Sequence, residues 1–175
     1  MYLNTNYQRS GAGALLNYIE KGRGLRNSAG REVTDRERDS FVEKSREHQF
    51  ERELRISPDP EADVSRADLE RETERYLREF TRDRPSVRGV YARHNDNGIE
   101  HVHVALTGER RDLYLDRNDL ERDRERLSRR LERDRERART REPERDRELA
   151  RDIERKREQE RERKRERGCD LGVGR

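Results

Sequence analysis

Three of the chain's four histidines, His94, His101 and His103, fall within a single stretch of ten residues. The dipeptide Asn97–Gly98 between them strongly favours a two-residue hairpin turn, because both positions tolerate positive φ. A turn at this point pairs His94 with His101. Since opposed residues share a face and side chains alternate along a strand, His103 lies on the same face. The spacing therefore predicts that one hairpin gathers three imidazoles on one side of a sheet.

Three convergent imidazoles are typical of a metal site. They leave coordination positions open, as a catalytic metal requires. As ligands, imidazoles alone favour zinc or another transition metal. The alternative is a polar sheet face that carries three unrelated histidines. The metal site depends on the register of the hairpin, because a slip of one residue would move His94 to the opposite face.

The hairpin needs a sheet around it, and the apolar periodicity predicts the other elements. Strands are expected over residues 1–7, 50–56, 87–94 and 100–106, with a short further strand at Leu113 and Leu115. Helices are expected over residues 11–19 (capped by Ser10), 35–46, 66–80 (capped by Ser65) and from 120 onward. This order predicts an α+β fold, with an antiparallel sheet and helices on one face, close to a split βαβ plan. The histidines would occupy the face or rim that the helices leave open.

The composition divides the chain into two parts. Of 175 residues, 27% are hydrophobic and 49% are charged, so a core cannot extend over the whole chain. We expect one compact domain over residues 1–140 and an Arg/Glu-rich tail over residues 141–175. Glu and Arg recur in the tail at helical spacing, which favours an isolated charged helix, and a disordered tail is the alternative.

Arginine accounts for 40 of the 44 basic residues. Its planar fork suits phosphates and stacked bases better than lysine does, which favours a nucleic-acid partner, although a G+C-rich coding bias would give the same excess. The lone cysteine, Cys169, excludes a disulfide framework and favours a reducing cytoplasm. No apolar run approaches the length of a membrane span, and the N-terminus lacks the apolar core of a signal peptide. We therefore expect a cytoplasmic protein without membrane insertion.

Two stretches resemble a known family. His101 and His103, separated by one hydrophobic residue on a strand, with His94 before the turn, resemble the metal motif of the HUH endonucleases. Upstream, residues 14–22 (ALLNYIEKG) resemble the Tyr-Ile motif near the start of plasmid mobilisation relaxases. The segment 54–58 (LRISP), followed by a helix, also fits the relaxase layout. The resemblance covers about residues 1–130.

The resemblance implies a DNA strand transferase in which Tyr18 is the nucleophile. Its substrate would be single-stranded DNA at an origin of transfer, and its partners would be the accessory proteins of a relaxosome. His94, His101 and His103 would hold Mg²⁺ or Mn²⁺ in such an enzyme, rather than the Zn²⁺ that imidazoles alone suggest. The alternative for Tyr18 is a packing role, since aromatic residues in a helix stripe usually belong to the core.

Other polar residues are candidates for supporting roles. A carboxylate that orients the histidines has three candidates, Asp96, Glu51 and Glu53. The basic residues just past Tyr18 are candidates for holding the DNA backbone, namely Lys21, Arg23 and Arg26. Such residues are equally expected at an ordinary helix end, where the dipole favours cations.

Three other functions stay open. A rolling-circle replication initiator belongs to the same superfamily, but such proteins place the nucleophile after the histidines, and Tyr114 is the only tyrosine there. A non-catalytic DNA-binding accessory protein would use the histidines for a structural ion and would form no covalent adduct. An interaction protein dominated by its charged helix would show no salt-sensitive DNA affinity.

Overall fold

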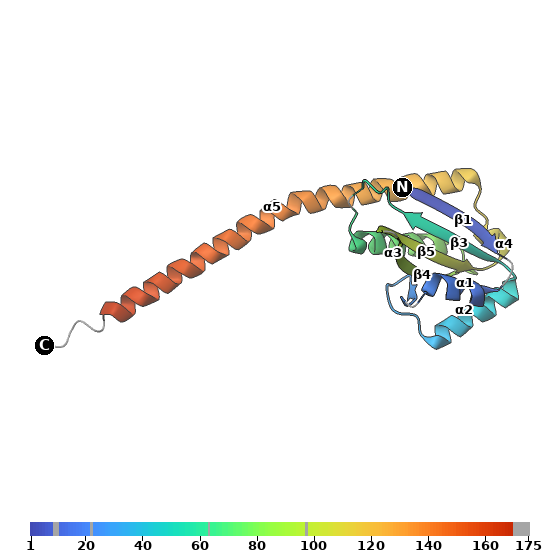
Figure 1. Cartoon of the computed structure of the whole chain (residues 1–175), viewed down its shortest axis with the longest axis horizontal. Coiled ribbons are helices and arrows are strands. Elements are labelled where there is room, and N and C mark those ends of the chain that lie inside the picture. The colour runs from blue at the N-terminus through green and yellow to red at the C-terminus, as the bar shows by residue number, and fades with distance from the viewer. Residues whose placement is uncertain (9–10, 22, 63, 97, 170–175) are drawn as a thin grey trace. The chain divides into compact units, whose positions relative to one another are not determined.

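The computed structural model describes residues 1–8, 11–21, 23–62, 64–96 and 98–169 (Figure 1). The elements follow in the order β1 (Tyr2–Gln8), α1 (Ala12–Glu20), β2 (Arg26–Asn27), α2 (Asp35–His48), β3 (Glu51–Ser57), α3 (Arg66–Arg82), β4 (Arg88–Asp96), β5 (Ile99–Thr107), α4 (Arg110–Leu113) and α5 (Arg117–Cys169). The chain forms two compact units, Met1–Arg133 and Asp134–Arg175. The first unit contains the five named strands and the histidines.

The five strands form one sheet in the order β1-β3-β5-β4-β2, and all neighbouring pairs are antiparallel. The expected α+β fold with an antiparallel sheet is therefore confirmed. The hairpin register is also confirmed: His94 pairs with His101, and Ala92 pairs with His103. Gly98 in the turn has a φ of +78°, a left-handed conformation that glycine adopts without strain.

Helices cover both faces of the sheet, so the expectation of helices on one face is wrong. The helices α1 and α2 pack with Val90, Ala92 and Ala105, whereas α3 and the beginning of α5 pack with Val102, Val104 and other residues of the opposite face. The reason lies in β5, whose residues 101–107 are all buried. A strand that is buried on both faces must be covered on both.

The other expected helices and strands are present with small shifts of their ends, because their capping signals are local. Thr34 and Glu37 form a capping box at the start of α2, and the Ser65 hydroxyl accepts from the Asp68 N–H at the start of α3. At the start of α1 the N-cap position belongs to Gly11, and Ser10, the expected cap, lies outside the described residues.

Two elements differ from expectation. The predicted strand at Leu113 and Leu115 is wrong, because Arg110–Leu113 form the short helix α4. Leu113 is the last residue of this helix and Leu115 lies in the loop that follows it, and both side chains are buried. The strand β2 was not expected. It pairs with Tyr91 and Val90 of β4. A strand of two residues is too short to show an alternation of apolar and polar residues in the sequence.

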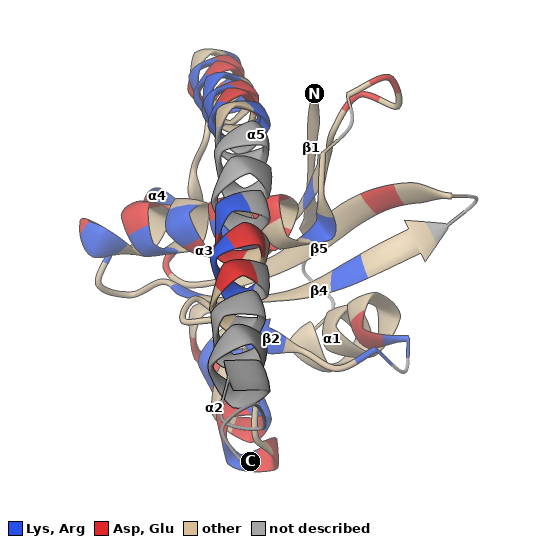
Figure 2. Ribbon diagram, turned by 90° about the vertical axis from the view of Figure 1, so that its left-hand side faces the viewer, with Lys and Arg blue, Asp and Glu red and all other residues tan. Residues whose placement is uncertain are grey.

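In the second unit, α5 continues as a helix to Cys169. Figure 2 shows acidic and basic residues interleaved along the coloured parts of α5, whereas β1, β4 and β5 are mostly uncharged. Residues 151–156 are exposed, and Arg155 pairs with Asp152 one turn earlier at 2.7 Å. Pairs at this spacing each stabilise an isolated helix by about 0.2–0.5 kcal/mol. None of the described helices is both long enough and apolar enough to cross a membrane.

Candidate metal centre

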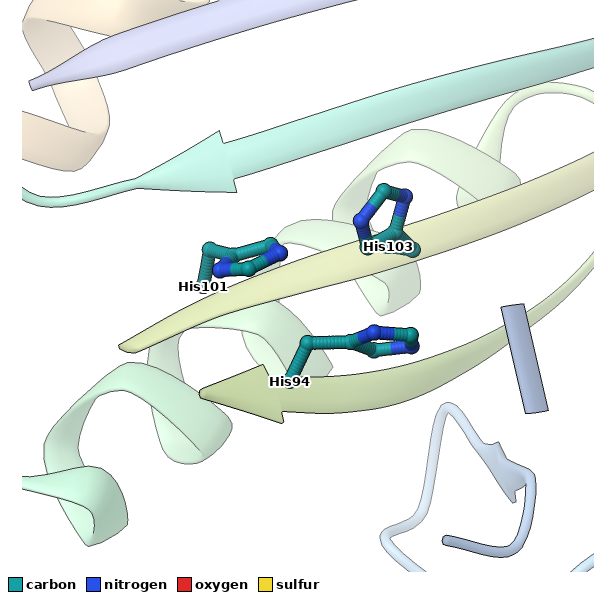
Figure 3. Close-up of side chains that lie close together, drawn as sticks. All are labelled: His94, His101 and His103. Carbon is teal, nitrogen blue, oxygen red and sulfur yellow. The ribbon is translucent and has the colours of Figure 1, made fainter. Parts of the chain in front are cut away.

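The three imidazoles meet on the face of β4 and β5 that α1 covers (Figure 3). The ring centroids lie 4.6 Å apart for His94 and His103, 5.0 Å for His101 and His103, and 5.5 Å for His94 and His101. One nitrogen from each ring lies within 4.8 Å of the other two. The three histidines therefore lie close enough together to bind one metal ion, as the hairpin register predicts.

Backbone carbonyls orient two of the rings. His94 Nε2 donates to the carbonyl of Ile19 on α1, and His101 Nδ1 donates to the carbonyl of Ile99 at 2.9 Å. A carbonyl oxygen only accepts, so in a neutral ring the contacting nitrogen carries the proton and the other nitrogen carries the lone pair. Metal-binding histidines usually donate their second nitrogen to a carbonyl or a carboxylate in this way. The contacts of both rings fit metal ligands.

Glu53 orients the third ring. Its Oε1 lies 2.7 Å from Nδ1 of His103, which matches the carboxylate–histidine contact seen behind many metal ligands. Glu51, two residues earlier on the same face of β3, instead binds the hydroxyl of Ser45 on α2. The side chain of Asp96 lies outside the described residues. Of the two described candidates, Glu53 is the one that contacts a histidine.

The histidines are almost completely buried. Their exposed fractions are 1% for His94, 1% for His101 and 5% for His103. The expectation that they line an open face or rim is therefore wrong. The cause is α1, which packs Leu15, Leu16 and other apolar residues against the β4–β5 half of this face.

Tyr18, the candidate nucleophile, lies at the edge of the histidine cluster. Its ring meets the ring of His103 edge-on, with 5.7 Å between centroids and an interplanar angle of 87°. The side chain is 48% exposed, which excludes the alternative that Tyr18 is a core residue. Its neighbours in the helical stripe, Leu15 and Ile19, are buried, so the periodicity that places α1 also turns Tyr18 toward solvent.

A contact with α2 holds the end of α1 that carries Tyr18. The guanidinium of Arg38 donates to the carboxylate of Glu20 at 2.5 Å and to the side-chain oxygen of Asn17 at 2.6 Å. These two acceptors flank Tyr18 in the sequence. The fork of one arginine therefore fixes the helix on either side of the candidate nucleophile.

The three basic residues after Tyr18 lie in different places. Lys21 ends α1 in a left-handed conformation, and its Nζ lies 5.1 Å from the centroid of the Tyr18 ring. Arg23 is exposed in the following loop. Arg26 lies on the edge strand β2 and donates to the carbonyl of Gly30 at 2.9 Å. The structure thus brings Lys21 to Tyr18 and leaves Arg26 bound to its own loop.

Strand pairing brings further residues to the centre that the sequence did not single out. Arg55 on β3 pairs with His103, and Asn4 on β1 pairs with Arg55, so both side chains share the histidine face. The alternation of β3 predicts that Arg55 faces away from Leu54 and Ile56. It cannot predict the neighbouring strand, because that depends on pairing between distant segments.

Comparison with known proteins gives no family assignment. No protein-family model matches the chain, and neither a curated protein nor a solved structure matches it significantly. The functional proposal therefore depends on the residues of the site and their geometry.

Proposed function

We propose that this protein is a metal-dependent DNA strand transferase of the HUH type. It would nick single-stranded DNA at an origin of transfer, as plasmid mobilisation relaxases do, and act with relaxosome accessory proteins. The observation that carries the proposal is the position of Tyr18, a half-exposed hydroxyl-bearing ring in edge contact with the three-histidine cluster. A nucleophile beside a group of potential metal ligands is one arrangement that supports phosphoryl transfer to a side chain.

In the proposed reaction the Tyr18 oxygen attacks the scissile phosphorus in line with the leaving 3′ oxygen. A bond forms between the tyrosine oxygen and phosphorus, and the bond from phosphorus to the 3′ oxygen breaks. The phenol loses its proton and the leaving oxygen gains one. The products are a 5′-phosphotyrosine and a strand with a free 3′-hydroxyl. Because the number of phosphoester bonds is unchanged, the reverse step can reseal the strand.

Residues around Tyr18 have separate roles in this proposal. A phenol is mostly protonated at neutral pH, so negative charge developing on its oxygen needs stabilisation. The ammonium of Lys21, which lies over the Tyr18 ring, would supply part of it. His94, His101 and His103 would hold the ion, and Glu53 would keep His103 in the required orientation.

A divalent ion bound to the three histidines would neutralise charge on the non-bridging phosphate oxygens. The ligand set itself favours Zn²⁺ or another transition metal, since imidazole suits zinc, copper, iron and nickel better than it suits Mg²⁺. The resemblance to relaxases favours Mg²⁺ or Mn²⁺. Mn²⁺ is the transition metal of the two ions that the resemblance favours, and we propose it as the first ion to test, with Zn²⁺ beside it.

The proposal is tested by looking for the covalent intermediate. The full chain is incubated with a labelled pool of random-sequence single strands and Mn²⁺, Mg²⁺ or Zn²⁺, and a labelled protein band is sought on a denaturing gel. We expect an adduct that EDTA prevents and that Tyr18→Phe abolishes. Tyr114→Phe is the control, because Tyr114 is exposed and is the tyrosine that follows the histidines.

Other outcomes would reassign the protein. An adduct that persists in Tyr18→Phe and disappears in Tyr114→Phe would indicate the rolling-circle arrangement. DNA binding by the parent chain without an adduct, in the presence of any of the three metals, would indicate a non-catalytic accessory protein.

A further inference from the structure

The face of the sheet that carries the histidines has a half covered by α1 and a half on which several side chains are exposed. The apolar residues of α1 pack on β4 and β5, through Val90, Ala92 and Ala105. The core cluster on this face contains no residue of β1 or β3, whose apolar residues belong to the cluster on the other face. Among the described residues of the strip that β1 and β3 form on this face, Glu51 and Ser57 at the two ends of β3 are buried, whereas β1 and the middle of β3 beside His103 carry exposed side chains.

The side chains on this strip follow from the pairing of β1 with β3. Tyr2 pairs with Ser57, Asn4 with Arg55 and Asn6 with Glu53, and paired residues share a face. Tyr2 is 60% exposed, and Asn4, Asn6 and Arg55 are exposed as well. Residues two apart on a strand are about 6.8 Å apart, so the side chains of β1 form a regular row.

The charge of the strip suits a polyanion. Among its described side chains, the two carboxylates are both engaged: Glu53 contacts His103, and Glu51 is buried against Ser45. Arg55 is the charged group that remains exposed on the strip. A phosphate that approaches along β3 would therefore meet a guanidinium and no free carboxylate of this row.

We propose that the strip of Tyr2, Asn4, Asn6 and Arg55 binds the single-stranded DNA next to the phosphate that Tyr18 attacks; the proposal rests on the function proposed above. The ring of Tyr2 would stack on a base, and the amides of Asn4 and Asn6 would hydrogen-bond to base edges. Arg55 pairs with His103, so its guanidinium would hold the backbone phosphate next to the one that Tyr18 attacks. Single-stranded DNA is favoured over duplex, because faces and edges of bases are accessible together only in an unpaired strand.

Binding is best measured without the covalent step. The full chain carrying Tyr18→Phe is titrated, with Mn²⁺ present, against a fluorescein-labelled random single strand of about 16 nucleotides, and Kd is obtained from fluorescence anisotropy. We expect Tyr2→Ala to raise Kd about tenfold and Tyr2→Phe to leave it nearly unchanged, because the stacking ring is kept. Tyr114→Ala is the matched control, since Tyr114 is also 60% exposed and lies in the loop before α5.

Arg55 is tested through the salt dependence. Arg55→Ala should weaken binding and reduce the slope of log Kd against log salt by about 0.7, the value for one phosphate contact on a single strand. Arg36→Ala is the control, because Arg36 is an exposed arginine of α2, away from the strip. An unfolding midpoint temperature equal to that of the parent chain would show that the fold of each variant is intact.

The outcomes separate this inference from the proposed function. An adduct formed by the parent chain, together with parent-like Kd values for Tyr2→Ala and Arg55→Ala, would overturn the strip and leave the function in place. Strip-dependent binding without an adduct would overturn the function and keep the strip as a DNA-binding surface. Equal affinity for duplex, tighter affinity for RNA of the same length, or a dimer that Tyr2→Ala dissolves in light scattering would each assign the strip to another occupant.

Discussion

The two faces of the sheet differ in what the same strands place on them. Along β5, His101 and His103 point toward α1, and Val102 and Val104 point toward α3. Both sets are buried. At this point of the sheet, one face therefore collects imidazoles that converge on a single point, and the other collects apolar side chains that pack. Because side chains alternate, neighbours in the sequence belong to different faces, and substitutions one residue apart should have different consequences.

One charged residue on each face sharpens the contrast. On the α3 face, Arg52 is fully buried, its guanidinium lies 3.8 Å from the centroid of the Tyr7 ring, and burial lowers the pKa of Arg52 to about 10. Arg52 therefore stays charged at neutral pH and is held by stacking. On the histidine face, Glu53 contacts His103 at the edge of the candidate centre. The first charge lies within the apolar packing, and the second lies beside groups that can bind an ion.

The largest effect is expected from the histidines themselves. Alanine at His94, His101 or His103 should weaken metal binding and the proposed nicking. The loss should exceed the factor of about 10–100 that is typical when a residue supporting a ligand is removed. Double variants should add little, because the three histidines of the proposed site would act as a unit. Since the rings are buried, the free energy of unfolding should fall too. Calorimetric metal titration and adduct formation measure the two functions.

The fourth histidine is the control for this prediction. His48 lies on α2 outside the cluster, so His48→Ala should retain parent metal affinity. Insertion of one residue between Asp96 and Asn97 should be as damaging as loss of a ligand, through register alone. Three mild and independent effects of the cluster variants, with no metal dependence, would mean that the histidines are unrelated.

The next largest effect is expected one residue away from Glu53, on the other face. Leu54 is fully buried in the α3-side core, so Leu54→Ala should lower the free energy of unfolding by about 2–5 kcal/mol. Metal affinity of the folded protein should change less than about twofold, because Leu54 faces away from the histidines. Urea unfolding and metal titration check the two values. A large loss of metal affinity, measured at a temperature at which Leu54→Ala is still folded, would show that the two faces are coupled.

A smaller effect is expected at Glu53. Glu53→Gln should lower metal affinity about 10–100-fold, because the amide supports His103 less strongly than the carboxylate does. Glu51→Gln is the matched control on the same strand and face. Its carboxylate contacts Ser45 and should affect stability without affecting metal affinity. Equal metal affinities for the two variants would remove Glu53 from the centre.

The smallest effect on the domain is expected from the tail. Deletion of residues 145–175 should change the free energy of unfolding of the domain by less than about 0.5 kcal/mol and should leave the proposed nicking activity in place, because these residues belong to the second unit. General DNA affinity or partner binding should weaken with the loss of arginines. Loss of cooperative unfolding in the truncated chain would show that the tail contributes to the core.

Local signals predicted the parts of the fold that they determine. The Asn-Gly turn fixed the hairpin register and hence the histidine cluster, and the caps at Thr34 and Ser65 lie where two helices begin. Features that depend on tertiary packing could not be predicted from such local signals. The coverage of both sheet faces, the burial of the histidines under α1 and the placement of Glu53 all follow from pairing between distant segments. No single segment carries that information.

The closeness of the three candidate ligands in the sequence has a consequence for folding. His94 and His103 are joined by a hairpin with a two-residue turn, so the loop-closure entropy of bringing the ligands together is small. An isolated hairpin of this kind forms in about 1–10 μs, long before β1 must find β3. Because only a short loop must close, the proposed site can form transiently in the denatured chain, which should retain some affinity for the ion. Because binding to the denatured state offsets binding to the native state, the ion should raise the unfolding midpoint by less than its native affinity implies.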